Sequence, residues 1–222
     1  MSWTIQRSDD VTPAAIAHNK ALDRLQVALE QAKRNKILLF CSAPDIGVSS
    51  SRQLSSYLPF GCTSIPGMFK IGAANADGTI NGWAGNPEFV DFILPGQNVS
   101  VKDDDKVNTE DQLPKTGSSV ATALAAGLAA LLIQCVRMGA LYDHFFLKGM
   151  ADGNTIGEIK KFDVMKKALK LVSHDYNEKD KRLEVETFFT KPGRDLGSEG
   201  LTEEEKWKKI SILARDLVMR SS

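Results

Sequence analysis

The stretch Ile37-Leu-Leu-Phe-Cys-Ser-Ala-Pro-Asp-Ile-Gly47 determines the fold class expected for this sequence. Its first five residues form a continuous apolar run of strand length, which is typical of a strand buried on both faces. An amphipathic helical pattern precedes this run at residues 14–32, and Thr12-Pro13 supplies an N-cap followed by proline at the first helical position. Residues 2–6 alternate like a short strand. Strand, helix and buried strand in that order predict one parallel crossover unit.

Further strands are predicted after this unit. Short apolar runs at residues 68–73 and 89–94, and a segment with two glycines at 75–83, alternate with turn signals. A polar, acidic loop at 101–116 leads into the apolar stretch 120–136, which falls short of the roughly 20 apolar residues that span a bilayer. This stretch therefore predicts a buried helix. We expect an α/β protein with a mostly parallel sheet flanked by helices.

The last part of the chain has a different pattern. Beyond residue 150 two amphipathic helical stretches are separated by a charged connection, and the second opens with a capping box, Thr202-Glu-Glu-Glu205. We expect residues 1–150 to form the main domain and residues 151–222 to form a helical extension packed on it.

Length and composition narrow the possible classes. The 222 residues are 42% hydrophobic and 25% charged, as in a single globular domain of generous size. Lys plus Arg equal Asp plus Glu at 28 each, so the charge gives no reason to expect nucleic acid as a partner. Three cysteines at unrelated spacing argue against a disulfide framework and a structural zinc site. No signal peptide is visible, so we expect the chain as written to stay inside the cell. We also expect no membrane partner. The location of any longer protein is left open.

Two segments stand where sites form in folds of this class. Gly117-Ser118-Ser119 precedes the apolar helix, where free N–H groups favour an anion, although a serine there can equally be a plain N-cap. Ala43-Pro44-Asp45 follows the buried strand, and sites in parallel sheets gather at the C-terminal ends of strands; the alternative is a plain Pro-Asp turn. The three consecutive aspartates at 103–105 lack the spacing of an EF-hand, so no metal site is expected.

These segments and their order resemble the subtilisin-like serine peptidases (subtilases), in particular a fungal branch of that family. Gly117-Ser-Ser-Val-Ala-Thr-Ala-Leu-Ala-Ala-Gly127 is similar to the family's nucleophile segment, Gly-Thr-Ser-x-Ala-Thr/Ser-Pro-x-x-Ala-Gly. Residues 38–47 resemble the strand and turn that end in the oxyanion-hole asparagine. Ile71-Gly-Ala73 and Ile93-Leu-Pro-Gly96 resemble two further landmarks in the expected order, and the resemblance covers most of residues 1–140.

The resemblance implies a serine endopeptidase, a hydrolase that cleaves peptide or protein substrates and needs no cofactor. It makes Ser119 the nucleophile and places Asp45 at the oxyanion-hole position. The positions that it assigns to substrate binding are Ser2, Trp3 and Thr4, on a strand that pairs with the peptide backbone, together with Ala43 and Pro44.

The chain departs from the family in its acid and base. In subtilases the catalytic aspartate and histidine come before the serine, each on its own motif. We expect neither the Asp-x-Gly motif nor the His-Gly-Thr motif in this chain, and His18, His144 and His174 stand in unrelated settings. The resemblance therefore implies the C-terminal part of a catalytic domain whose first strands are absent, either a truncated gene product or an incomplete gene model, and nearly inactive as this chain.

Two alternatives to a peptidase fragment stay open at this point. One is a non-catalytic remnant that acts as a binding or regulatory module, with the missing N-terminal half or a full-length relative as its partner. The other is an unrelated α/β protein in which Ser119 is an N-cap.

Overall fold

The computed structural model describes most of the chain as two compact units. Unit 1 is Met1–Ala125 with Lys179–Lys181, and unit 2 is Ala126–Glu178 with Arg182–Ser222. This division falls inside helix α3 (Ser118–Phe146), and the domain boundary expected at residue 150 stays a prediction. The described residues are 1–47, 51–75, 77–79, 82, 87–100, 114–146, 153–198 and 200–221.

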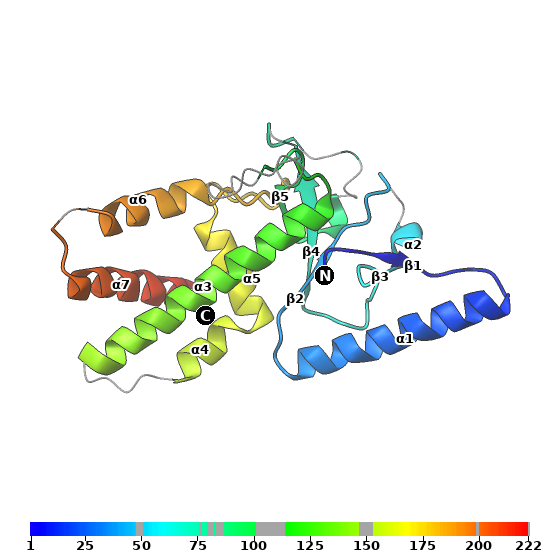
Figure 1. The fold of residues 1–222 in the computed structure, drawn as a ribbon, viewed down its shortest axis with the longest axis horizontal. Helices are drawn as coiled ribbons and strands as arrows, with labels where there is room; N and C mark the ends of the chain where they lie inside the picture. The colour runs from blue at the N-terminus through cyan, green and yellow to red at the C-terminus, as the bar shows by residue number, and fades with distance from the viewer. Residues whose placement is uncertain are drawn as a thin grey trace, which may run out of the picture. The chain divides into compact units, whose positions relative to one another are not determined.

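Unit 1 is built on a three-stranded parallel sheet (Figure 1). Strands β2 (Leu39–Ser42), β4 (Met68–Ala74) and β5 (Phe92–Pro95) lie in the order β2-β4-β5, and both pairs are parallel. Six of the seven residues of the central strand β4 are buried, as expected for a strand covered on both faces. The prediction of a mostly parallel sheet flanked by helices is confirmed.

Aromatic rings run across one face of this sheet. Phe40 stacks on Phe69 with 4.7 Å between ring centroids, and Phe69 lies 6.1 Å from Phe92 in a tilted arrangement. All three rings are buried, so each strand contributes one aromatic side chain to a continuous row. The apolar run at residues 37–41 thus supplies Phe40 to this row and Cys41 to the core on the other face.

Helix α1 (Pro13–Arg34) follows the sequence prediction closely. Its N-cap is Thr12, whose hydroxyl oxygen accepts a hydrogen bond of 3.2 Å from the backbone N–H of Ala15. Leu22 and Leu29 lie on its buried face and join the core cluster that contains Cys41. The amphipathic pattern therefore places this helix against the sheet.

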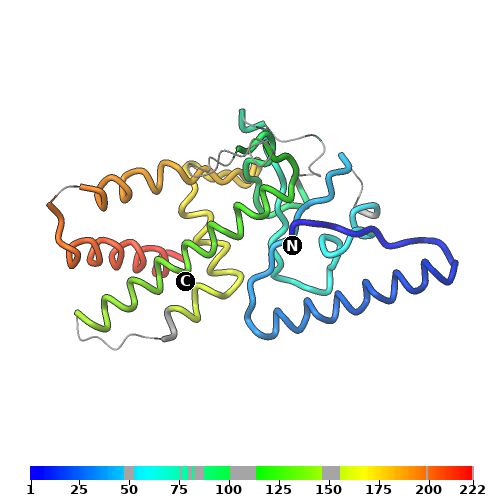
Figure 2. Tube along the Cα trace, in the orientation of Figure 1, coloured from blue at the N-terminus to red at the C-terminus, as the bar shows by residue number. Residues whose placement is uncertain are grey.

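The parallel crossover that begins at residues 2–6 was a wrong prediction. Only β1 (Ile5–Gln6) is a strand there, and it pairs antiparallel with β3 (Tyr57–Leu58) in a separate two-stranded sheet. Instead, the N-terminus itself lies beside β2 (Figure 2): the Met1 ammonium donates to the carbonyl of Phe40, and the Met1 carbonyl accepts from the N–H of Ser42 at 3.2 Å. The parallel crossover of the structure runs from β2 to β4.

The opposite edge of the sheet is bonded by a distant segment. The backbone N–H of Ile93 in β5 donates to the carbonyl of Lys181 at 2.9 Å, and the Lys181 ammonium donates to the carbonyl of Val90 at 2.9 Å. This contact explains why Lys179–Lys181 belongs to unit 1. Each outer strand of the sheet thus has a backbone partner at one point along its edge.

The chain around β5 differs in part from the sequence predictions. The strand expected at 89–94 is shorter, because a 3-10 turn (Pro87–Phe89) precedes it and β5 begins at Phe92. The described positions of 75–83 form a turn, in which the N–H of Asn75 bonds the carbonyl of Thr79, and its other positions lie outside the described residues. Residues 101–113, including the three aspartates, also lie outside them.

Helix α3 is longer than the apolar stretch 120–136, since it runs for 29 residues. Gly117 precedes it with φ +134°. Among the described residues, α3 is the one helix whose length and composition would allow a membrane crossing. Its most apolar window has a mean hydropathy of 2.0, and a third of that window is buried. Core helices of globular proteins have the same length and composition.

Unit 2 is helical and contains more helices than the two amphipathic stretches expected. Beside the second part of α3 it holds α4 (Gly153–Ile159), α5 (Phe162–Val172), α6 (Glu186–Leu196) and α7 (Glu203–Ser221). The predicted capping box of α7 is present. Fully buried side chains of its core are Leu132, Val136, Ile159, Met165, Leu169, Val172 and Leu217.

Helix α3 meets α7 at a glycine, which gives a matched pair of substitutions. A Cβ added at Gly139 would lie 2.5 Å from the Cβ of Ala214 and 3.3 Å from the Cα of Ser211, whereas nothing lies within 4 Å of a Cβ added at Gly127. We expect Gly139→Ala to lower the free energy of unfolding by about 1–2 kcal/mol, because the clash outweighs the gain in helix propensity. Gly127→Ala should raise it by about 0.5–1 kcal/mol. Urea unfolding monitored by circular dichroism tests both, and equal stabilisation by the two would contradict the packing of α3 on α7.

Candidate functional site

The start of α3 is held against the ends of the parallel strands. The N–H of Gly117 donates to the carbonyl of Gly96 at 2.7 Å, and the N–H of Gly96 donates to the carbonyl of Ala74 at 3.0 Å. A Cβ on Gly96 would lie 2.5 Å from the Cβ of Ala73 and 2.8 Å from the carbonyl oxygen of Gly117. Glycine is therefore required at position 96, and this close approach brings the serine segment to the C-terminal edge of the sheet.

Ser118 connects α3 to the turn that follows β2. Its hydroxyl donates to the carbonyl of Ala43 at 2.5 Å, and its backbone N–H lies 3.2 Å from each carboxylate oxygen of Asp45. The Ser118 side chain is almost completely buried, while Asp45 is exposed. Ser118 is thus a structural serine, and Asp45 accepts one of the free N–H groups at the start of the helix.

Asp45 and Ser119 flank the same glycine. A Cβ placed on Gly117 would lie 3.1 Å from a carboxylate oxygen of Asp45 and 3.2 Å from the hydroxyl of Ser119. The structure therefore brings these two predicted site residues together at the N-terminus of α3. Ser119 is half-buried, and no acceptor for its backbone N–H is found in the part of the chain that the structure describes. A hydroxyl and a free N–H at a helix N-terminus are groups that acyl transfer can use as nucleophile and oxyanion donor.

The contact of Asp45 differs from that of an oxyanion donor. An amide at this position would donate a hydrogen bond to a developing oxyanion, whereas a carboxylate accepts and repels negative charge. In the structure the carboxylate accepts from Ser118 and so acts as a cap of α3. The assignment of Asp45 to the oxyanion-hole position stays a prediction.

The predicted substrate-binding residues occupy two adjoining segments. Ser2 and Trp3 are exposed and Thr4 is half-buried, directly after the contact of Met1 with β2. Ala43 and Pro44 are buried. The N–H of Ala43 already donates to the carbonyl of Ile71 at 2.8 Å, and its carbonyl accepts from Ser118, so both backbone groups of Ala43 are bonded within unit 1.

Each of the three histidines has a local partner other than Ser119. The His18 Nε2 atom lies 2.9 Å from the carbonyl of Gln6, the His144 ring contacts Phe145 edge-on, and the His174 Nδ1 atom lies 3.0 Å from a carboxylate oxygen of Asp175. His144 and His174 belong to unit 2, whereas His18 and Ser119 belong to unit 1. Within unit 1, the partner described for His18 is Gln6 and not Ser119.

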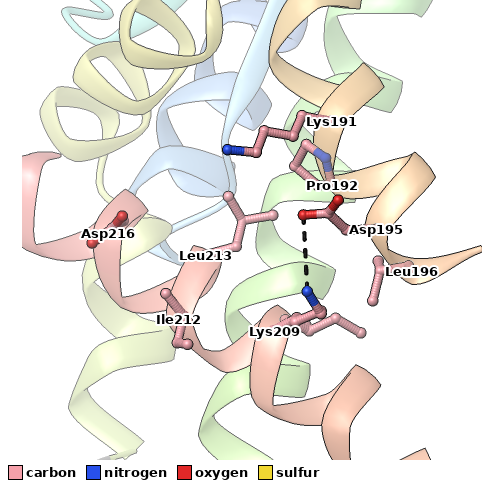
Figure 3. A pocket seen from close by; sticks show the side chains of 9 residues that line it. Lys191, Pro192, Asp195, Leu196, Lys209, Ile212, Leu213 and Asp216 are labelled. Carbon is pink, nitrogen blue, oxygen red and sulfur yellow. Dashed lines mark ion pairs between the residues drawn. The ribbon is translucent and has the colours of Figure 1, made fainter. Parts of the chain in front are cut away.

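The expectation that the chain has no Asp-x-Gly motif is wrong, because two triplets share this form with the family's catalytic aspartate motif. Asp45-Ile-Gly47 is the turn after β2. Asp195-Leu-Gly197 lies at the end of α6, where Asp195 pairs with Lys209 at 3.8 Å (Figure 3). That pair borders a cavity of about 340 Å³ between α6 and α7, and the residues that line it include no histidine, serine or cysteine. Neither aspartate contacts a histidine in the described part of the chain.

The cysteines and acidic residues give no alternative centre. All three cysteines are free, burial raises the pKa of each thiol, and for Cys41 it reaches about 12. Thiols with raised pKa values are poor nucleophiles. No group of His, Cys, Asp or Glu side chains that could hold a metal ion occurs among the described residues.

Sequence reasoning did not find the residues that position the serine. Gly96 was recognised only as part of a landmark, and the carbonyl of Ala43 and the hydroxyl of Ser118 carry no sequence signal of their own. The Pro95-Gly96 turn signal was visible, but its purpose depends on the approach of Gly117, which is set by tertiary structure.

The fold and the serine segment define an α/β protein with a serine at the N-terminus of a helix that follows parallel strands. A family model described as the subtilase family matches residues 1–143, and the chain belongs to that family of serine peptidases. No curated protein matches the sequence.

Two solved structures have a similar fold. A lanthipeptide protease gives a TM-score of 0.55 at 16% identity, and the prenylagaramide maturation protease PagA gives 0.50 at 17% identity. In both comparisons the match covers 86% of this chain and 60% of the other. The chain thus spans about 60% of the length of these structures.

The capping contact of Asp45 can be tested by stability measurements. We expect Asp45→Ala to lower the free energy of unfolding by about 1 kcal/mol, as loss of an N-cap does, and Asp45→Asn to lower it by only a few tenths because the amide oxygen still accepts. Urea unfolding provides the measurement, with Asp9→Ala as a control for the loss of one exposed negative charge. An Asp45→Ala protein as stable as the control would mean that the carboxylate does not cap α3.

Proposed function

We propose that this chain carries the nucleophile of a subtilisin-like serine endopeptidase, with Ser119 as that nucleophile and peptides or proteins as substrates. The observation that supports this most is the position of Ser119 at the N-terminus of α3, with Asp45 on the other side of Gly117. Family membership over residues 1–143 includes both residues. The fungal branch suggested by the sequence is part of this proposal.

The chemistry assigns one task to each group at the start of α3. The Ser119 hydroxyl oxygen attacks the peptide carbonyl carbon, and the free N–H at the helix N-terminus bonds the oxyanion that develops. The hydroxyl proton passes to a base, which then protonates the leaving amine. Ser2, Trp3 and Thr4 hold the peptide as an added strand, with Ala43 and Pro44 beside it.

In this proposal the base and the acid that orients it are not among the described residues of this chain. In the subtilisin series removal of the histidine lowers the turnover rate on the order of a million-fold. We therefore propose that the chain is the C-terminal part of a catalytic domain, that its histidine and aspartate come from polypeptide outside residues 1–222, and that the chain by itself is nearly inactive.

A second candidate function is a binding or regulatory module. It is favoured by the local partners of all three histidines and by the carboxylate at position 45, which opposes oxyanion formation. In this case residues 2–4 and the turn after β2 would bind an extended peptide without cleaving it. A peptide that binds equally well to the Ser119→Ala protein and is never cleaved would favour the module over the peptidase.

Active-site labelling tests the nucleophile directly. The polypeptide encoded in frame upstream of Met1 is read from the transcript and added to the chain, and both forms are treated with a fluorophosphonate. We expect the extended form to label at Ser119 and to cleave casein, and the chain alone to label several orders of magnitude more slowly, because it has no base.

Ser119→Ala should abolish labelling and cleavage, while Ala substitution of the exposed Ser198 in unit 2 should retain both. An extended polypeptide that carries the acid and base motifs but neither labels nor cleaves would refute the proposal.

A further inference from the structure

Helices α6 and α7 of unit 2 border a cavity of about 340 Å³, which we call the α6–α7 cavity (Figure 3). It lies outside the family match, which ends at residue 143. None of the eleven residues of α6 is buried, although one side of this helix carries Phe188, Phe189, Pro192 and Leu196. The volume lies in the range of sites that take small molecules, about 300–1,000 Å³. The apolar side of α6 is therefore available to a small ligand.

The walls of the α6–α7 cavity come from one face of each helix. Positions 191, 192, 195 and 196 line it from α6, and positions 209, 212, 213 and 216 line it from α7, at the intervals that share a helix face. Pro192 shapes the α6 wall, because its ring has no N–H for the carbonyl four residues earlier. The apolar side chains of the lining are Pro192, Leu196, Ile210, Ile212 and Leu213. An apolar group that enters between the helices would leave water for these side chains.

The charged residues of the lining leave one cation without a partner. A carboxylate oxygen of Asp195 lies 3.8 Å from the Lys209 ammonium, and one of Asp216 lies 3.9 Å from the Arg220 guanidinium. The Lys191 ammonium has no hydrogen-bond or ion-pair partner in the part of the chain that the structure describes. In Figure 3 it lies away from the Asp195–Lys209 pair. A ligand with a single negative charge is the electrostatic complement of this lining.

We propose that the α6–α7 cavity binds a linear alkyl carboxylate of medium chain length, a free fatty acid. Its alkyl chain lies against the apolar walls, and its carboxylate accepts from the Lys191 ammonium. The C-terminus of a peptide has the same charge but fits less well. Its amide groups would lose water to apolar walls, and the other charged groups of the lining already have ion-pair partners. An alkyl chain has no polar group that needs a partner.

Titration calorimetry of the whole chain with hexanoate, octanoate and decanoate tests the apolar part of the site. Each ligand is used below its micellar concentration. We expect the affinity to rise about tenfold for every two methylenes, because each methylene leaves water between α6 and α7. Ile212→Glu places a carboxylate in the wall and should weaken decanoate binding about tenfold or more.

Met219→Glu is the matched control for this substitution. Ile212 and Met219 are 52% and 79% exposed on α7, so neither change should unfold the chain, and Met219 does not line the cavity. Met219→Glu should therefore leave the affinity for decanoate unchanged. Far-ultraviolet circular dichroism of each variant separates loss of binding from loss of fold.

The part played by Lys191 is tested with octanoate and octan-1-ol. Lys191→Gln removes the charge, so the affinity for octanoate should fall about fivefold while the affinity for octan-1-ol stays the same. Lys208→Gln changes an exposed lysine of α7 that does not line the cavity, and it should alter neither affinity.

Four results would overturn the proposal. They are no heat of binding up to millimolar decanoate, an affinity that does not depend on chain length, equal weakening by Ile212→Glu and Met219→Glu, and equal effects of Lys191→Gln and Lys208→Gln on octanoate. Tighter binding of the peptide acetyl-Ala-Ala-Leu than of decanoate would also overturn it and would assign the cavity to a peptide C-terminus.

Discussion

The site depends on Ser118, which joins two segments that are more than seventy residues apart in the sequence. Its hydroxyl bonds the carbonyl of Ala43 and its N–H bonds the carboxylate of Asp45, so a single residue fixes the turn after β2 to the first turn of α3. Because the hydroxyl is buried, water competes little for this contact. The orientation of Ser119, the next residue, follows from this attachment.

Parts of the fold could be predicted because local sequence determines them. Residues 37–41 and 68–73 are apolar at nearly every position, and a strand buried on both faces requires that pattern. The start of α1 was predictable because the Thr12 hydroxyl accepts from one of the unpaired N–H groups at a helix start and Pro13 has no N–H to leave unpaired. The end of α3 was not predictable. Gly139 disfavours a helix locally but lies inside α3, because it packs against α7. No local sequence signal reveals this packing.

Tertiary pairing explains the remaining errors. The alternation at residues 2–6 indicates a strand but not its partner, and the structure pairs it with β3 while Met1 takes the position beside β2. At the site, the structure has Asp45 and Ser119 on either side of Gly117, and the roles that the resemblance gives them stay predictions. The resemblance did not give the direction of the hydrogen bond at Asp45, because that depends on which N–H groups the folded chain leaves free.

The contact that stabilises the start of α3 also opposes the chemistry proposed there. The N-terminus of a helix attracts negative charge, and the Asp45 carboxylate meets that attraction in the resting protein. An oxyanion formed at a carbonyl attacked by Ser119 would use the same helix N-terminus and would be repelled by the carboxylate. Among the described residues the N–H of Ser119 has no acceptor, so in the proposed reaction stabilisation of the oxyanion would depend on that backbone group more than on side chain 45. In the proposed peptidase the rate would therefore depend chiefly on the base that accepts the serine proton.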